Sequence, residues 1–143
     1  MNAGAPAGRP DPADPVALAR ALIACPSVTP EAAGTLDLLE GALAAEGFSV
    51  FRPTFSEPGT PDVENLFARI GEGAPHLVLA GHVDVVPPGP EEAWSRPPFS
   101  GALEDGIVHG RGAVDMKGGL AAMVAAAVRH VRASGGLPRG TLS

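Results

Sequence analysis

The chain has 143 residues, enough for a single domain with a hydrophobic core. Hydrophobic residues make up 45% and charged residues 18%, which is typical of a globular protein and argues against a disordered one. Sixteen acidic and ten basic residues give a net charge of −6. That balance argues against binding to nucleic acid or to an anionic membrane, because both interactions need a basic surface.

The N-terminal residues and the cysteine content bear on the compartment. Residues 1–14 (MNAGAPAGRPDPAD) are rich in Pro, Ala and Gly, lack the apolar segment of a secretory signal, and are expected to form a flexible tail. No later segment reaches the roughly 18 consecutive apolar residues of a membrane span. Cys25 is the only cysteine, so an intrachain disulfide is excluded and a reducing compartment is favoured. These features predict a soluble, cytoplasmic protein in which Cys25 is a small apolar filler.

Two helices are predicted near the N-terminus. Asp14 is a good N-cap and Pro15 suits the first helical position, and apolar residues then recur with helical spacing as far as Cys25. A second helix is predicted over about residues 35–46, where leucines form an apolar stripe. Gly47 is its natural C-cap.

The rest of the chain mixes strands with one more helix. Extended segments are predicted within residues 48–55, 65–70 (NLFARI) and 76–80 (HLVLA). The last is nearly all apolar, which predicts a central strand covered on both faces. Asp105-Gly106 predicts a hairpin between residues 102–103 and 107–108, and a long Ala-rich helix is predicted over about 120–133, before a strand that begins at Gly140. Helices that alternate with apolar strands predict an α/β sandwich.

A first candidate site is His82-Val83-Asp84, directly after the apolar strand. Residues i and i+2 of an extended segment point to the same side, so both side chains can face one cleft. A metal-binding imidazole usually has its far nitrogen held by a carboxylate, and Asp84 could hold His82 in that way. The pattern alone is common by chance, so it gains weight only from a second motif.

The second candidate is Asp115, in the glycine-rich segment GRGAVDMKGG. A carboxylate held between such turns can bridge two metal ions. Alternatively, Asp115 caps the helix that follows it. A dinucleotide-binding fingerprint in GRGAVD is disfavoured, because the third glycine is missing and a hairpin precedes the turn. Lys117 is interpreted as a solvated charge, and three histidines are expected to be structural or surface residues: His76, His109 and His130.

Together with the segments around them, the two motifs resemble the M20 family of zinc metallopeptidases. The resemblance rests on LIACPSVTPEAAGTLDLLEGALAAEGF, VENLFARIG, HLVLAGHVDVVPPG and EEAWSRPPFSGALEDGIVHGRGAVDMKGG, and it runs from about Val16 to the last residue. It implies a zinc-peptidase-like three-layer sandwich with a mixed central sheet. Residues 15–143 would then be the N-terminal part of the catalytic domain, with the rest of that domain and a lid domain absent.

The resemblance also implies roles for the candidate residues. His82 resembles the ligand to one zinc, Asp115 the carboxylate that bridges both zincs, and Asp84 the acid assigned as catalytic, which orients His82. It implies two Zn²⁺ per complete subunit, with Co²⁺ as a possible substitute, and a cis peptide between Asp115 and Met116. The family's Glu-Glu pair, a general base and a zinc ligand, has no counterpart up to Ser143, so the chain alone is expected to be inactive.

The motifs further suggest a reaction. VDVVPPG, Trp94 with PPF at 97–99, and GRGAVDMKGG favour members that hydrolyse the amide of a small succinylated amino acid over the related acetylornithine deacetylases. The complete protein would be a homodimer. Another amidohydrolase of the family, such as a deacetylase or a carboxypeptidase-like enzyme, stays open at this point, as does a fragment without catalytic function.

Overall fold

The computed structural model describes residues 9–137 and 139–143 of the chain. Its helices are α1 (Pro15–Ala24), α2 (Thr35–Ala44) and α3 (Gly118–Ser134), joined by the short helices η1 (Glu91–Ala93) and η2 (Ala113–Lys117). Its strands are β1 (Ser49–Phe51), β2 (Thr54–Phe55), β3 (Val63–Glu64), β4 (Phe67–Glu72), β5 (His76–Leu77), β6 (Ala102–Glu104), β7 (Ile107–His109) and β8 (Gly140–Leu142). No helix among these residues is both long and apolar enough to cross a membrane.

The helix ends follow the predicted signals. The Asp14 carboxylate accepts hydrogen bonds from the backbone N–H groups of Val16 and Ala17 at 2.9 and 3.1 Å, which confirms it as the N-cap of α1. After α2, Gly47 has a φ of +87° and its N–H donates to Ala44 O, while the Phe48 N–H donates to Leu43 O. This pair of bonds is the Schellman motif, which favours glycine at the left-handed position.

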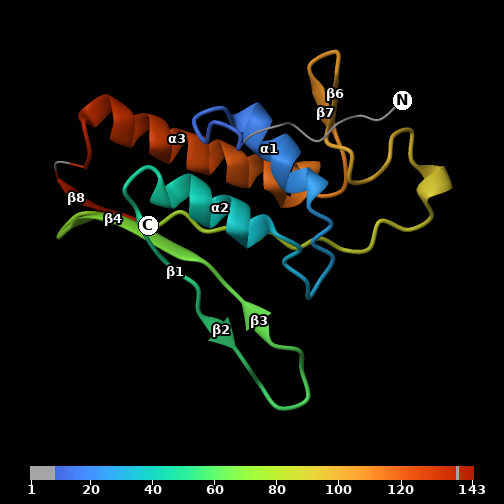
Figure 1. Cartoon of the computed structure of the whole chain (residues 1–143), viewed down its shortest axis with the longest axis horizontal. Helices are drawn as coiled ribbons and strands as arrows, with labels where there is room; N and C mark the ends of the chain where they lie inside the picture. The colour runs from blue at the N-terminus through green and yellow to red at the C-terminus, as the bar shows by residue number, and fades with distance from the viewer. Residues whose placement is uncertain (1–8, 138) are drawn as a thin grey trace.

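Four strands form a mixed sheet in the order β1-β4-β8-β5. The β1–β4 and β4–β8 pairs are antiparallel and the β8–β5 pair is parallel. Two small antiparallel pairs, β2–β3 and β6–β7, lie outside this sheet (Figure 1). In the β6–β7 hairpin, Asp105 and Gly106 have positive φ values of 50° and 80°, as the predicted two-residue turn requires.

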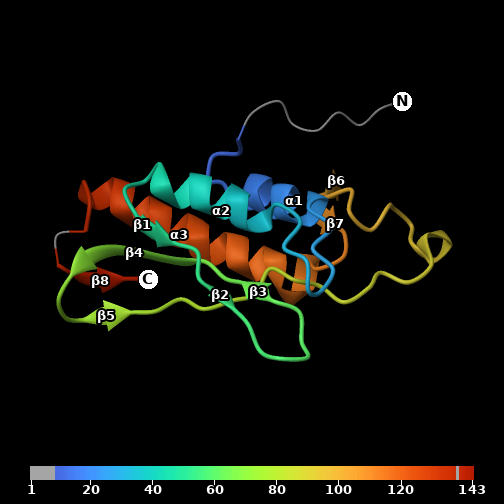
Figure 2. The ribbon, with the colours of Figure 1, turned by 60° about the horizontal axis from the view of Figure 1, so that its bottom comes forward.

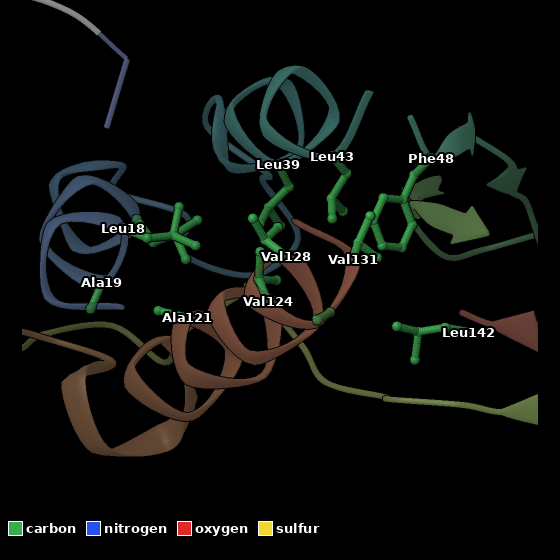
Figure 3. Packing of buried hydrophobic residues seen from close by; sticks show 12 residues of the cluster. Leu18, Ala19, Leu39, Leu43, Phe48, Ala121, Val124, Val128, Val131 and Leu142 are labelled. Carbon is green, nitrogen blue, oxygen red and sulfur yellow. The ribbon is translucent and has the colours of Figure 1, made fainter. Parts of the chain in front are cut away.

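The three long helices lie together over one face of the sheet (Figure 2). Their buried residues form one core with the sheet, to which α1 gives Leu18 and Leu22, and α3 gives Ala121 and Val128, all with no exposed surface (Figure 3). Small Ala side chains on α3 let α1 approach closely. The α/β prediction is confirmed.

The other face of the sheet is open among the described residues. Val50 and Ala68 pack against the core, so the alternation of side chains places Phe51 and Phe67 on the opposite face. There the two rings lie 6.5 Å apart and are 58% and 44% exposed. The structure thus shows two layers of the expected three-layer sandwich, and the third layer stays a prediction.

The prediction of a central strand over residues 76–80 is wrong for the described chain. Only His76–Leu77 forms strand β5, which lies at the edge of the sheet with both residues exposed. Its pairing ends at the last residue, Ser143, which receives a hydrogen bond from the Leu79 N–H at 2.7 Å. An apolar segment favours burial, but whether the segment is buried depends on which strands pair with it.

The predicted tail, residues 1–14, lies partly outside the described residues, which begin at Arg9. Its last residues contact α3. Arg129 Nε donates to Ala13 O at 2.8 Å, and Arg132 forms an ion pair with Asp11 at 3.0 Å. Arg9 already lies against α2, where a Cβ at Gly41 would meet the Arg9 Cζ. Contacts with the helical layer are therefore present before the expected boundary at residue 15.

Candidate metal centre

His82 is positioned by an extended segment that runs between α3 and the end of α1. Gly81 lies so close to η2 and α3 that a Cβ there would meet Met116 Cε at 3.1 Å and Met123 Cε at 3.2 Å, respectively. Farther along, Val85 forms a parallel bridge with Val28, and Ser27 Oγ donates to Val83 O at 2.7 Å. The segment is therefore held on both sides, which fixes where the His82 ring can lie.

Asp115 is presented by the turn before α3. Gly112 begins that turn with a φ of +85°, and its carbonyl accepts the Lys117 N–H at 2.8 Å. Inside the turn Asp115 has an extended backbone (φ −128°, ψ 100°), and the Asp115-Met116 peptide is cis, as the resemblance implied. The Asp115 side chain makes no capping hydrogen bond, and the N-cap of α3 is Lys117. The capping interpretation of Asp115 is therefore excluded.

The structure brings the three predicted site residues together. His82 Nε2 lies 3.0 Å from Asp115 Oδ1, although 33 residues separate them in the chain. On the other side of the ring, Nδ1 lies 3.0 Å from the Asp84 carbonyl oxygen and 3.3 Å from the Asp84 carboxylate. An Nδ1–H that donates to Asp84 leaves the Nε2 lone pair facing Asp115.

The charges around the ring shift its pKa. Partial burial alone would lower the pKa of His82, but the hydrogen bond to the Asp84 carbonyl, the hydrogen bond to Asp115 and the charges of both carboxylates outweigh burial. The pKa of His82 is therefore raised above its usual value. A metal ion at Nε2 would have to displace a proton from that nitrogen at low pH, so metal binding here depends on pH.

Lys117 is not the solvated charge that the sequence predicted. Its side chain is fully buried, and Nζ donates to Leu22 O and Cys25 O, both at 2.8 Å. Both carbonyls lie at the C-terminal end of α1, where the helix dipole favours a cation. Burial lowers the pKa of the Lys117 ammonium to about 8. Lys117 thereby bonds the turn that carries Asp115 to the C-terminal end of α1. Ser27 and Val28, which follow α1, hold the His82 segment.

Sequence reasoning missed three polar residues that support the site: Ser27, Thr29 and Lys117. Thr29 Oγ1 donates to Asp84 Oδ2 at 2.6 Å, across 55 positions of the chain. Each of these side chains contacts a partner that is distant in sequence, so the local pattern carries no signal for the contact. The three other histidines stay outside the site, and His76 Nε2 is instead 2.8 Å from Ser143 Oγ.

The donors present fit part of a zinc site. Within residues 9–137 and 139–143, no group of three or more His, Cys, Asp or Glu side chains is placed to hold a metal. His82 Nε2 and the Asp115 carboxylate, 85% exposed, are two donors of the kind that zinc prefers. Two ligands of a tetrahedral zinc lie about 3.4 Å apart, so the observed 3.0 Å would need to widen by a few tenths of an ångström. A closed site needs further ligands.

A cavity of about 410 Å³ adjoins the His82 segment. It is lined by Thr29, His82 and Asp84, and otherwise mostly by apolar side chains of α2, α3 and the sheet, such as Leu39, Leu43 and Val124. The cavity therefore adjoins the candidate centre, but its mainly apolar lining does not by its own chemistry select a substrate.

Comparison with known proteins assigns the class. Residues 78–143, which contain His82, Asp84 and Asp115, match the family described as Peptidase family M20/M25/M40. The fold agrees with an M20 family metallo-carboxypeptidase from Sulfolobus solfataricus and with human carnosine dipeptidase 1, at TM-scores of 0.74 and 0.71. Each alignment covers 90% of this chain at 22% identity, and 29% and 30% of the two neighbours. Over residues 78–143 the chain is thus similar to the M20 family of peptidases.

Within the family, the chain is similar to succinyl-diaminopimelate desuccinylases. It is 61% identical to the desuccinylase of Bradyrhizobium diazoefficiens over 127 residues, which are 89% of this chain and 33% of that protein. It is 65% identical to that of Methylorubrum extorquens over 112 residues, which are 78% of this chain and 29% of that protein. The chain thus spans about a third of the length of the curated relatives it matches.

Proposed function

We propose that the complete protein hydrolyses the succinyl amide of N-succinyl-LL-2,6-diaminopimelate to succinate and LL-2,6-diaminopimelate. One observation carries the proposal: His82 Nε2 and the Asp115 carboxylate converge to 3.0 Å, with Asp84 behind the ring, in a chain that is 56–65% identical to desuccinylases. Residues 15–143 would be the N-terminal part of its catalytic domain. We place the protein in the cytoplasm, as a homodimer, in keeping with its family and its single cysteine.

The residues of this chain would act as holders of the metal pair. His82 would offer its Nε2 lone pair, and Asp84 would fix the tautomer, because its backbone carbonyl accepts a hydrogen bond from Nδ1 and its carboxylate lies 3.3 Å from the same nitrogen. Asp115, whose exposed carboxylate projects from its turn, would supply oxygen ligands to the metal pair. Two zinc ions, for which cobalt could substitute, would polarise the amide carbonyl and lower the pKa of a water molecule.

Hydrolysis also needs groups that these residues do not provide. A general base must take the proton of the attacking water and pass it to the leaving amine. Asp84 is engaged with His82, and Lys117 is buried against carbonyl groups, so neither suits that role. Because the chain spans about a third of its relatives' length, we place the general-base Glu, the remaining ligands and the lid domain outside these 143 residues.

The first test is substrate preference. The complete protein, loaded with zinc, is expected to hydrolyse N-succinyl-LL-2,6-diaminopimelate with a higher kcat/KM than N-acetylornithine or a dipeptide, and a chelator should abolish the reaction. The 143-residue chain by itself is expected to show no turnover, because the general base and most ligands are missing. A preference for N-acetylornithine would contradict the substrate assignment, and chelator-sensitive turnover by the short chain would contradict the incomplete site.

A further inference from the structure

Each oxygen of the Asp84 carboxylate has its own partner. Oδ1 lies 3.3 Å from His82 Nδ1, and Oδ2 accepts the Thr29 hydroxyl at 2.6 Å. An ionised carboxylate can only accept, so the hydroxyl is the donor. The other oxygen near this hydroxyl, Val85 O, is 3.4 Å away and therefore a weaker acceptor. Thr29, Asp84 and His82 form a chain of contacts that ends at the candidate metal ligand.

Thr29 is itself held in place by the backbone. Its N–H donates to Val85 O at 3.1 Å, and the Val85 N–H donates to Ser27 O at 2.9 Å, on either side of the Val28–Val85 bridge. Ser27, which is fully buried, adds its bond to Val83 O. The backbone around Thr29 thus runs parallel to that around Asp84, with Val28 opposite Val85. Its β-branched side chain has few rotamers, so the hydroxyl is fixed relative to the carboxylate.

The Asp84 carboxylate needs such a partner because little else sets its orientation. The terminal torsion of an aspartate is broad, and 44% of this side chain is exposed, so water competes for both oxygens. A donor at Oδ2 selects the rotation in which Oδ1 faces the imidazole. A charge-assisted hydrogen bond of this length is among the stronger ones in proteins.

We propose that Thr29 is a positioning residue that acts through Asp84 on His82. Its hydroxyl holds the carboxylate with Oδ1 toward the ring, where it reinforces the hydrogen bond that the Asp84 carbonyl accepts from Nδ1 and so favours the Nε2 lone pair on the metal side. The inference rests on the proposed role of His82 as a metal ligand and goes beyond it, because Thr29 touches neither the metal nor the ring. Thr29 should therefore set metal affinity from a distance.

Zinc affinity of the complete apo-protein, measured by competition with a chelator, tests the proposal without any substrate. Thr29→Val keeps the shape of the side chain and removes the hydroxyl, whereas Thr29→Ser keeps the donor. Loss of a direct outer partner weakens metal binding by about 10–100-fold, which is the expected effect of Asp84→Ala. Thr29→Val, one contact farther out, is expected to weaken zinc binding by about 3–10-fold, and Thr29→Ser to restore most of it.

A double variant shows whether Thr29 acts through Asp84. If it does, Thr29→Val adds nothing to Asp84→Ala, because the pathway is already broken; an independent structural effect would add in full. Normal zinc affinity in Thr29→Val, or full additivity with Asp84→Ala, would overturn the role of Thr29 alone. Normal zinc affinity in Asp84→Ala would also overturn that role, because the carbonyl of residue 84 would then hold Nδ1 without the carboxylate. Absence of zinc binding by the unaltered protein would overturn the proposed metal site as well.

Discussion

Replacing Asp115 with Ala in the complete protein is expected to remove activity and at least one equivalent of zinc together. In the proposed site, Asp115 is the group among the described residues that would contact both ions, and it lies 3.0 Å from His82 Nε2. Loss of a metal that stabilises transition-state charge by several kcal/mol corresponds to a fall in kcat of about a thousandfold or more. Metal analysis of the purified variant, made beside the rate measurement, checks both parts.

Two histidines provide matched controls for that substitution. His109 lies on β7 and His130 lies on α3, and neither forms a hydrogen bond or ion pair with the His82, Asp84 and Asp115 group. His109→Ala and His130→Ala should therefore keep normal zinc content and a nearly normal rate. A fully active Asp115→Ala variant that retains two zinc ions would end the claim that Asp115 bridges the metals.

Replacing Gly112 with Ala is expected to destabilise the complete protein by about 2–5 kcal/mol and to weaken zinc binding. Gly112 has a φ of +85°, and a Cβ there would lie 2.6 Å from Val85 Cγ1 and 3.3 Å from Lys117 Cδ. Val85 is buried and hydrogen-bonded to Ser27 and Thr29, so it cannot easily retreat. The added methyl group would push the Asp115 turn away from the His82 segment. Denaturant unfolding and zinc titration would measure the two effects.

Gly106 is the control that separates backbone strain from the steric clash. Its φ of +80° is nearly the same, but a Cβ there would have nothing within 4 Å. Gly106→Ala should therefore cost only the left-handed conformation, about 1–2 kcal/mol, and leave zinc binding unchanged. Equal losses of stability in the two variants would show that the close approach of Gly112 to Val85, between the Asp115 turn and the His82 segment, contributes nothing beyond the left-handed backbone.

Much of the local structure could be predicted because its causes lie close together in the sequence. Asp14 caps the helix that begins at the next residue. Gly47 ends α2 through its own bond to Ala44 and the bond of the next residue, Phe48, to Leu43. Asp105-Gly106 makes its own turn. His82 and Asp84 are two residues apart, so their shared side followed from the alternation of an extended chain.

The support of the site could not be predicted, because it depends on contacts across the fold. Lys117 follows a flexible-looking turn, and nothing nearby in sequence shows that its ammonium lies between two carbonyls of α1. The position of β5 at the sheet edge depends on which strands pair with it, and this pairing cannot be predicted from the apolar residues 76–80 alone. The convergence of His82 and Asp115 was expected only from the resemblance to a known family, not from spacing.

The most direct test is to locate zinc in the complete protein by anomalous X-ray diffraction at the zinc edge. One ion is expected to be bonded to His82 Nε2 at about 2.0–2.1 Å and to one Asp115 oxygen, and a second ion to the other Asp115 oxygen. Asp84 should lie behind the ring, on the Nδ1 side, as it does here. Zinc bound elsewhere, with His82 and Asp115 free of metal, would contradict the account.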